Sequence, residues 1–271
     1  MRIKTAAHLI IPFLMASLLF AQDETAKHGW QKEMAAGVTI NQNSYDNWTK
    51  GGENSYSWQV NYHFKFENDR EKTNWRNSGK FNYGMTKIGA EESKKSLDEI
   101  KIESVITYKL GINIDPYFSV NAETQSGAGY NYNVKPKVKI TSFMDPGYIR
   151  EAAGFGYKPN QSLFTRLGAS IKHTLVDNTE IVKAETEYGV ESVTDAKWKI
   201  SDTSQLETKL QLFSNLAGFK TIDVNWDTML SAKVSPYISM NFSIKLLYDN
   251  DISKKRQLNQ VLGIGLSYNF F

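Results

Sequence analysis

Charged side chains of both signs recur at every second position in many segments of this chain. That spacing places them on one face of an extended strand. In the segment from Leu206 to Leu212, for example, Glu207, Lys209 and Gln211 take one parity, and Leu206, Leu210 and Leu212 take the other. Facing an enclosed space, such side chains can cross-link it through ion pairs or line a narrow aqueous path. The candidates for this inward face are Lys101, Glu103, Lys109, Glu123, Arg166, Lys172, Glu185, Glu187, Glu191, Glu207, Lys209, Asp223, Asp227, Lys233 and Lys245.

Two turn-like segments hold the next candidates. Asn47 and Trp48 precede Gly51-Gly52, and the tandem glycines allow a turn that other residues resist. Trp48 could contact a ligand, although a tight structural turn explains the same residues. A longer loop carries Tyr130 and Tyr132. These tyrosines could belong to a binding loop or a lid, or could lie at the rim of the fold.

Catalytic and metal chemistry have weak support. His173 and Ser192 take the apolar parity of neighbouring segments and could form a pair on a lipid-facing surface, but no Gly-x-Ser-x-Gly motif is present. We therefore expect no enzyme. The run Asp249-Asn250-Asp251 could hold Ca²⁺ or bridge lipopolysaccharide through a cation, yet it lacks the glycine and distal glutamate of a calcium loop, so a polar turn is favoured. The chain has no cysteine. We expect no metal and no other cofactor.

The elements that must position these residues are amphipathic strands. From Ile238 to Tyr248 the even positions are apolar and the odd positions are polar, apart from Leu247. Such a strand, roughly 10 residues or more long, can cross a bilayer when tilted. Twelve segments follow this pattern: 30–43, 54–67, 74–87, 97–110, 116–127, 148–158, 163–175, 181–197, 203–214, 221–234, 237–249 and 256–271. They predict an all-β, antiparallel, up-and-down transmembrane β-barrel. A soluble β-sandwich is the alternative, but its closed core would not accept so many charges.

The ends and the loops predict where this barrel resides. Residues 1–21 resemble a signal peptide, with Arg2 and Lys4 before an apolar stretch, and leave 22–271 as one domain. Short connections alternate with longer ones, which is typical of periplasmic turns and outer loops. We expect the outer membrane of a Gram-negative bacterium, with both termini in the periplasm. Removing Arg2 and Lys4 lowers the net charge from +3 to 3 − 2 = +1, which argues against nucleic acid as a partner.

Aromatic residues suggest the remaining partners. Trp58, Trp75, Trp226, Tyr237 and Tyr248 fall near strand ends and fit girdles at the membrane surfaces, in contact with lipids and lipopolysaccharide. The last segment carries Tyr268, Phe270 and Phe271, and barrels that end in an aromatic residue present a signal to the barrel-assembly machinery. Here the alternation ends at Phe270, which leaves Phe271 off register. The oligomeric state is not predicted.

Several motifs resemble an uncharacterised family of outer-membrane barrels, domain of unknown function 3078 (DUF3078). The segment 47–55, Asn-Trp-Thr-Lys-Gly-Gly-Glu-Asn-Ser, is similar to its Asn-Trp-x-x-Gly-Gly-x-Asn-Ser signature. Similar segments follow at 83–87, 142–159, 212–215, 222–226, 247–252 and 262–268. The resemblance implies an outer-membrane barrel, distantly like the salt-induced outer-membrane proteins, and supplies no activity or ligand.

Two functions are therefore open. The first is a narrow channel or passive transport barrel for small polar solutes, with a mixed-charge lumen gated by long loops. The second is a plugged barrel that has a structural or surface-binding role through those loops. A constriction of one sign would favour ion selectivity, and the inward residues show none.

Overall fold

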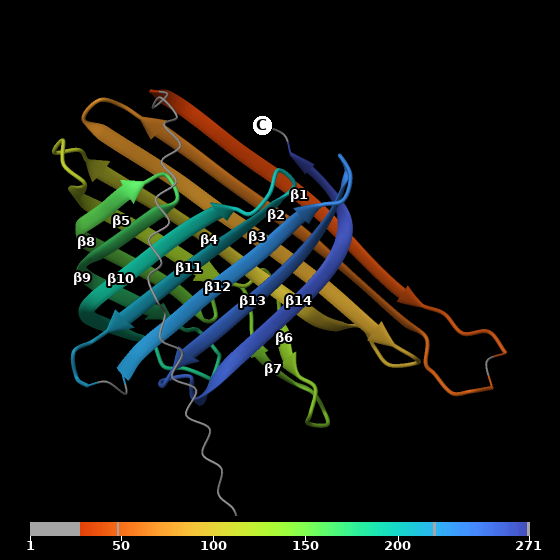
Figure 1. The fold of residues 1–271 in the computed structure, drawn as a ribbon. Coiled ribbons are helices and arrows are strands. Elements are labelled where there is room, and N and C mark those ends of the chain that lie inside the picture. Colours follow the sequence, from red (N-terminus) through yellow and green to blue (C-terminus); the bar gives the residue numbers. More distant parts are fainter. Residues whose placement is uncertain (1–27, 48, 219–220, 270–271) are drawn as a thin grey trace, which may run out of the picture.

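The computed structural model describes residues 28–47, 49–218 and 221–269, and these form a closed antiparallel barrel of twelve strands (Figure 1). The barrel strands are β1 (Gly29–Asn43), β2 (Ser55–Asp69), β3 (Thr73–Ile88), β4 (Lys94–Tyr108), β5 (Ile114–Thr124), β8 (Gly147–Asn160), β9 (Leu163–Leu175), β10 (Glu185–Lys199), β11 (Ser204–Ser214), β12 (Ile222–Lys233), β13 (Ile238–Asp249) and β14 (Ser253–Asn269). Each pairs with its neighbours in this order, and β14 returns to β1. The predicted fold class is confirmed.

Alternation decides which side chains enter the lumen. Leu167 is 60 % exposed and lies opposite Phe155 across one strand pair, whereas the adjacent Arg166 is 2 % exposed. Tyr188, 70 % exposed, lies outside on the neighbouring strand. A soluble sheet would bury the apolar side chains and expose the charged ones. The opposite arrangement is that of a transmembrane β-barrel, and the sandwich alternative is wrong.

A short hairpin was not predicted. β6 (Gly129–Asn131) and β7 (Val138–Thr141) pair with each other inside the connection between β5 and β8, apart from the barrel sheet (Figure 1). Strands of three and four residues are too short to show an alternating pattern. Elsewhere the predicted boundaries differ by a few residues. The largest shift is in β10, which begins at Glu185 rather than Ile181.

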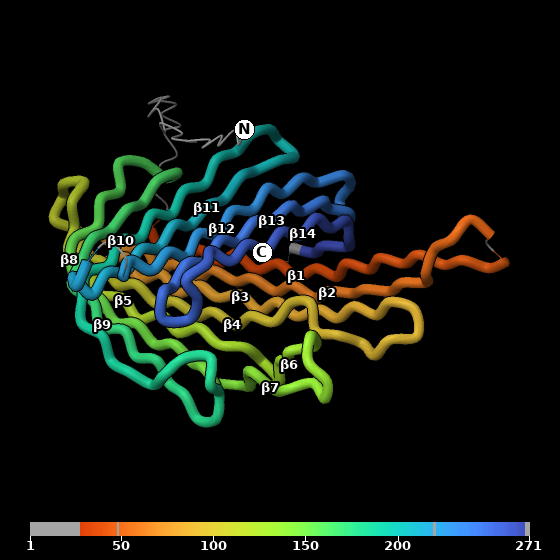
Figure 2. The backbone as a smooth tube through the Cα atoms, turned by 90° about the horizontal axis from the view of Figure 1, so that it is seen from below, coloured from red at the N-terminus to blue at the C-terminus, as the bar shows by residue number. Residues whose placement is uncertain are grey.

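Short and long connections alternate around the barrel. We call the end that carries residues 44–54, 125–146, 176–184 and 250–252 the long-loop end, and the opposite end the short-turn end. β1 begins and β14 ends at the short-turn end. The hairpin of β1 and β2 extends beyond the other strands (Figure 2). No helix among the described residues is long and apolar enough to cross a membrane. The predicted signal peptide lies outside the described residues.

Candidate functional site

The middle of the lumen is bridged by an ionic cluster that joins opposite walls. Asp227 of β12 accepts hydrogen bonds from Lys80 of β3 and Lys101 of β4, each at 3.2 Å. Lys245 of β13 reaches Glu99 of β4 at 2.5 Å and Glu123 of β5 at 3.2 Å. β4 and β12 are six strands apart in either direction around the ring. Since single side-chain pairs connect such distant strands, the lumen is narrow at this level.

A second cluster lies nearer the short-turn end. Glu103 of β4 accepts hydrogen bonds from Arg166 of β9 and, at 2.6 Å, from Lys209 of β11. Asp195 of β10 pairs with Arg76 of β3 at 3.2 Å and with Lys209 at 3.6 Å. Arg166 and Glu103 are almost completely buried. Buried charges are stable only when paired, and these ion pairs cross-link the lumen at this level.

A third cluster lies toward the long-loop end, where one lysine holds three acids. Lys172 of β9 pairs with Asp223 of β12 at 2.6 Å, with Glu187 of β10 at 2.8 Å and with Asp249 of β13 at 3.5 Å. Lys172 is only 3 % exposed. Of these acids, Asp249 belongs to the run for which the sequence favoured a polar turn over a Ca²⁺ site. The barrel's closure brings it into the lumen.

Of the remaining inward candidates, Glu191 is buried in the middle of β10, and the others lie near the ends of the barrel. Lys197 joins Glu207 at 3.0 Å and reaches across the lumen to Glu33 of β1 at 3.5 Å. Lys109 falls one residue beyond β4, in a short turn, where it pairs with Asp69 at 2.6 Å. Glu185 is exposed at the start of β10.

Apolar side chains inside the lumen were missed by the sequence analysis. Phe213 of β11 and Val193 of β10 occupy inward positions and are fully buried. Arg150 and Lys172 lie over the Phe213 ring, at 5.5 Å and 5.4 Å from its centroid. The sequence did contain a sign of them, because Phe213 and Val193 each interrupt the run of polar residues at the inward positions of their strand. These side chains exclude water around the ion pairs and strengthen them.

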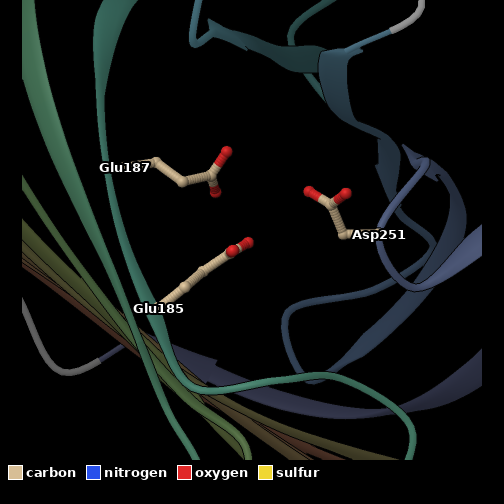
Figure 3. Close-up of side chains that lie close together, drawn as sticks. All are labelled: Glu185, Glu187 and Asp251. Carbon is tan, nitrogen blue, oxygen red and sulfur yellow. The ribbon is translucent and has the colours of Figure 1, made fainter.

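Acidic groups also gather at the long-loop end. The carboxylates of Glu185, Glu187 and Asp251 face one another across the lumen (Figure 3), and those of Asp223, Asp249 and Asp251 form a second group. In each group the ligand oxygens lie within 4.8 Å of one another. Carboxylate oxygens of this kind are the ligands that Ca²⁺ and Mg²⁺ take. However, Lys172 already places a positive charge among Glu187, Asp223 and Asp249.

The first long loop makes the turn that its glycines predict. Gly51 and Gly52 have φ angles of 80° and 134°, and Asn47 has 52°. A side chain at Gly52 would meet the Tyr45 ring. Trp48 lies outside the described residues. An open depression between this loop and the next is lined by Tyr45, Asn47, Thr49, Gly52, Glu53, Asn54, Gly89 and Ala90.

The two loop tyrosines pack around a lysine. The rings of Tyr130 and Tyr132 lie 6.2 Å apart, and Lys137 Nζ lies 4.9 Å from the first centroid and 5.9 Å from the second. Lys94, at the start of β4, is 5.6 Å from the Tyr132 centroid. Cation–π contacts therefore join the β6–β7 segment to the loop before β4.

Asp145 fastens two long loops together. Its carboxylate accepts hydrogen bonds from the backbone N–H groups of Asp177 and Thr179 at 3.0 Å and of Asn178 at 3.1 Å. Desolvation acts to raise the pKa of Asp145, but these three donors outweigh it and hold the pKa below its ordinary value.

The predicted girdle residues lie on the outside, at several heights. Trp75, close to the short-turn end, is 6.2 Å from Trp30. Trp226 lies nearer mid-strand and donates a hydrogen bond to Thr208 at 2.8 Å. Trp58 packs against Tyr83, Tyr237 lies in a short turn, and Tyr248 is near the long-loop end. Of the terminal aromatics, Tyr268 faces outward on β14, whereas Phe270 and Phe271 lie outside the described residues.

The possible catalytic pair of His173 and Ser192 does not form in the structure. β9 and β10 pair in a register that sets His173 opposite Thr186 and Ser192 opposite Leu167. His173 Nδ1 and Thr186 Oγ1 are 3.0 Å apart. Ser192 lies six residues farther along β10 than Thr186, far beyond hydrogen-bond reach of the imidazole. Parity was right for both residues, but register cannot be read from parity alone.

Comparison with known proteins gives a match to one family model over part of the chain and several solved structures of low similarity. No curated protein sequence matches the chain. The COG4313 outer membrane channel from Pseudomonas putida F1 is similar in structure, with 8 % identity over 92 % of this chain and 98 % of that one and a TM-score of 0.43. The translocator domain of the autotransporter NalP from Neisseria meningitidis has 11 % identity over 92 % and 90 %, with a TM-score of 0.39. At such values the likeness carries no inference about transport or binding.

The family described as "Protein of unknown function (DUF3078)" matches residues 40–130. That stretch includes the Asn-Trp-x-x-Gly-Gly-x-Asn-Ser segment at 47–55 and the segment at 83–87. The fold itself, with an even number of antiparallel strands, an apolar outside and a charged inside, is that of an outer-membrane β-barrel. The predicted resemblance to the uncharacterised DUF3078 family of outer-membrane barrels is confirmed.

Proposed function

We propose that this chain is an outer-membrane barrel whose lumen is closed at rest, and that it works through its long loops and the chamber beneath them rather than as an open pore. The observation that carries this proposal is the set of ion pairs between non-adjacent strands at three levels of the lumen. Lys101–Asp227, Lys209–Glu103 and Lys172–Asp223 are one example from each level. Both termini would lie in the periplasm, so that the long loops face outward.

Burial supports closure independently of the contacts. Charges that line a water-filled pore stay hydrated, because leaving water is costly for an ion. Arg166, Glu103 and Lys172 are instead almost inaccessible, and Val193 and Phe213 fill space beside them. A solute that crossed the barrel would have to separate several of these pairs.

A narrow channel for small polar solutes is the second candidate. The side chains that close the lumen at mid-height belong to barrel strands, and Lys80, Lys101 and Lys245 each carry four rotatable methylenes. Such a closure can rearrange without unfolding. This candidate requires a trigger that separates the clusters.

Solute-driven swelling of liposomes that contain the refolded protein tests the proposal. The wild-type barrel should be impermeable to small sugars. The triple variant Lys101→Ala/Lys172→Ala/Lys209→Ala, which removes one long cationic side chain from each of the three clusters, should admit them. Lys199→Ala, which changes a lysine in an exposed pair with Asp202, is the matched control and should stay impermeable. Rapid swelling with the wild-type protein would overturn the proposal in favour of the channel.

A further inference from the structure

The barrel closes through a short seam. β1 and β14 pair over five residues each, Ala35–Thr39 with Gly265–Asn269. β1 pairs with β2 along its full length, and β14 pairs with β13 from Ile238 to Asp249. Among the described residues, β14 from Ser253 to Ile264 has no partner strand on its β1 side. β1 and β14 diverge toward the long-loop end (Figures 1 and 2).

Side-chain exposure follows the same asymmetry. Gln257 and Asn259 of β14 lie opposite Leu247 and Lys245 of β13 and so take the inward parity, yet both are exposed. Asn41 of β1 is also inward by parity and exposed. On the opposite wall, inward Ser170 and Thr174 are 4 % exposed. The inward side chains beside the seam are therefore accessible to solvent, whereas those of β9 are buried.

An unpaired strand edge needs hydrogen-bond partners. Backbone N–H and C=O groups that face hydrocarbon are costly when unsatisfied, which is why membrane barrels close completely. Here the unpaired edge of β14 runs beside outward-facing Leu258, Leu262 and Ile264, each more than half exposed. A molecule that fits must offer polar groups to the edge and apolar groups to these side chains, which defines an amphiphile.

Charged residues at the end of the seam indicate which kind of amphiphile would bind there. Lys254, Lys255 and Arg256 are consecutive and exposed at the long-loop end of β14. None of the three forms an ion pair with a described acidic residue. We propose that the gap between β1 and β14 is a lateral opening that admits a lipid with an anionic, phosphate-bearing headgroup. The headgroup would contact Lys254–Arg256, Gln257 and Asn259, and the acyl chains would pack against the leucines outside.

A thiol-reactive lipid tests this opening, because the chain has no cysteine of its own. Asn259→Cys would be refolded into phosphatidylcholine vesicles that contain a phosphatidylethanolamine carrying maleimide on its headgroup, which leaves the phosphate anionic. We expect labelling at least about tenfold faster than for Ser170→Cys, an inward residue of the closed wall. Gln257→Cys is the second seam variant if Asn259→Cys does not fold. Equal rates at seam and wall would overturn the opening.

Headgroup charge is tested with the same variant. A neutral lipid of equal chain length that carries maleimide in place of the phosphate headgroup should label Asn259→Cys several times more slowly. Adding Lys254→Gln, Lys255→Gln and Arg256→Gln should slow the anionic probe and leave the neutral probe unchanged. Equal labelling by both probes would overturn the anionic class. These readouts do not depend on whether the lumen conducts, so they stand apart from the proposed closure.

Discussion

Glu103 of β4 joins three strands, because its two oxygens hold a cation from β9 and another from β11. Glu103→Gln would keep the shape and leave Arg166 and Lys209 without that charge. Removing one member of a buried ion pair costs about 3 kcal/mol or more. We expect a loss of that size in the free energy of unfolding, measured by urea denaturation with tryptophan fluorescence.

The matched control for that change is Glu207→Gln. Glu207 pairs with Lys197, and both side chains are more than a third exposed. An exposed pair contributes about 1 kcal/mol or less, so this variant should unfold close to the wild type. Equal losses of unfolding free energy in the two variants would show that the buried second cluster stabilises the barrel no more than an exposed ion pair does.

Asp145 supports a pH prediction, since it lies in a loop outside the barrel wall. Its pKa is lowered in the folded protein, so its contribution is complete above the unfolded pKa and is lost as pH falls through the folded pKa. We expect amide protection at Asp177, Asn178 and Thr179 to be strong near neutrality and to decline in acid. Hydrogen exchange measured from neutral to acidic pH, corrected for intrinsic rates, follows this change.

Asp145→Asn is the complementary variant. The amide keeps one acceptor oxygen and loses the charge, so protection at the three residues should be weak at every pH. If wild type and variant showed the same pH profile, the three hydrogen bonds would not be controlled by this carboxylate.

Among the elements, β8 and β9 meet where neither strand has a side chain. Gly154 lies opposite Gly168 on the inward face, and a Cβ added at Gly154 would collide with the Leu167 carbonyl and the Gly168 Cα. Backbone cannot move aside as a side chain can. Gly154→Ala should therefore lower the free energy of unfolding by about 1–3 kcal/mol or prevent folding. Gly127→Ala, where nothing lies within 4 Å of the added atom, is the control and should be close to neutral.

The seam between β1 and β14 differs from the other strand pairs in its length, and its amides should report that difference. N–H groups of β14 between Gln257 and Ile264 that point toward β1 have no described partner strand. They should exchange at least about tenfold faster than those of β13 between Met240 and Leu246, which is paired on both sides. Uniform protection along β14 would mean that the seam closes in the membrane.

Across the whole molecule, local alternation was enough to predict the twelve barrel strands and the direction of most side chains. Tyr237–Asp249 shows why: its apolar and polar residues separate by parity alone, with no reference to distant parts of the chain. The β6–β7 hairpin was not predicted because strands of three and four residues are too short to show an alternating pattern. The pair His173–Ser192 failed because register depends on neighbouring strands.

The partners inside the lumen could not be predicted for a different reason. Parity indicates that Lys101 and Asp227 both face inward, but only the barrel's tilt and closure bring side chains 126 residues apart into contact. The same holds for Glu185 and Asp251 at the long-loop end. The sequence therefore predicted a mixed-charge interior, but it did not show whether these charges line an open lumen or close it.

Single-channel conductance of the refolded mature protein in a planar bilayer tests closure most directly. Heat-modifiable gel mobility would first confirm that the inserted protein is folded. Because ion pairs join non-adjacent strands at three levels of the lumen, the wild-type barrel should show no discrete openings. Steady, uniform openings from the folded wild-type protein would contradict a lumen that is closed at rest.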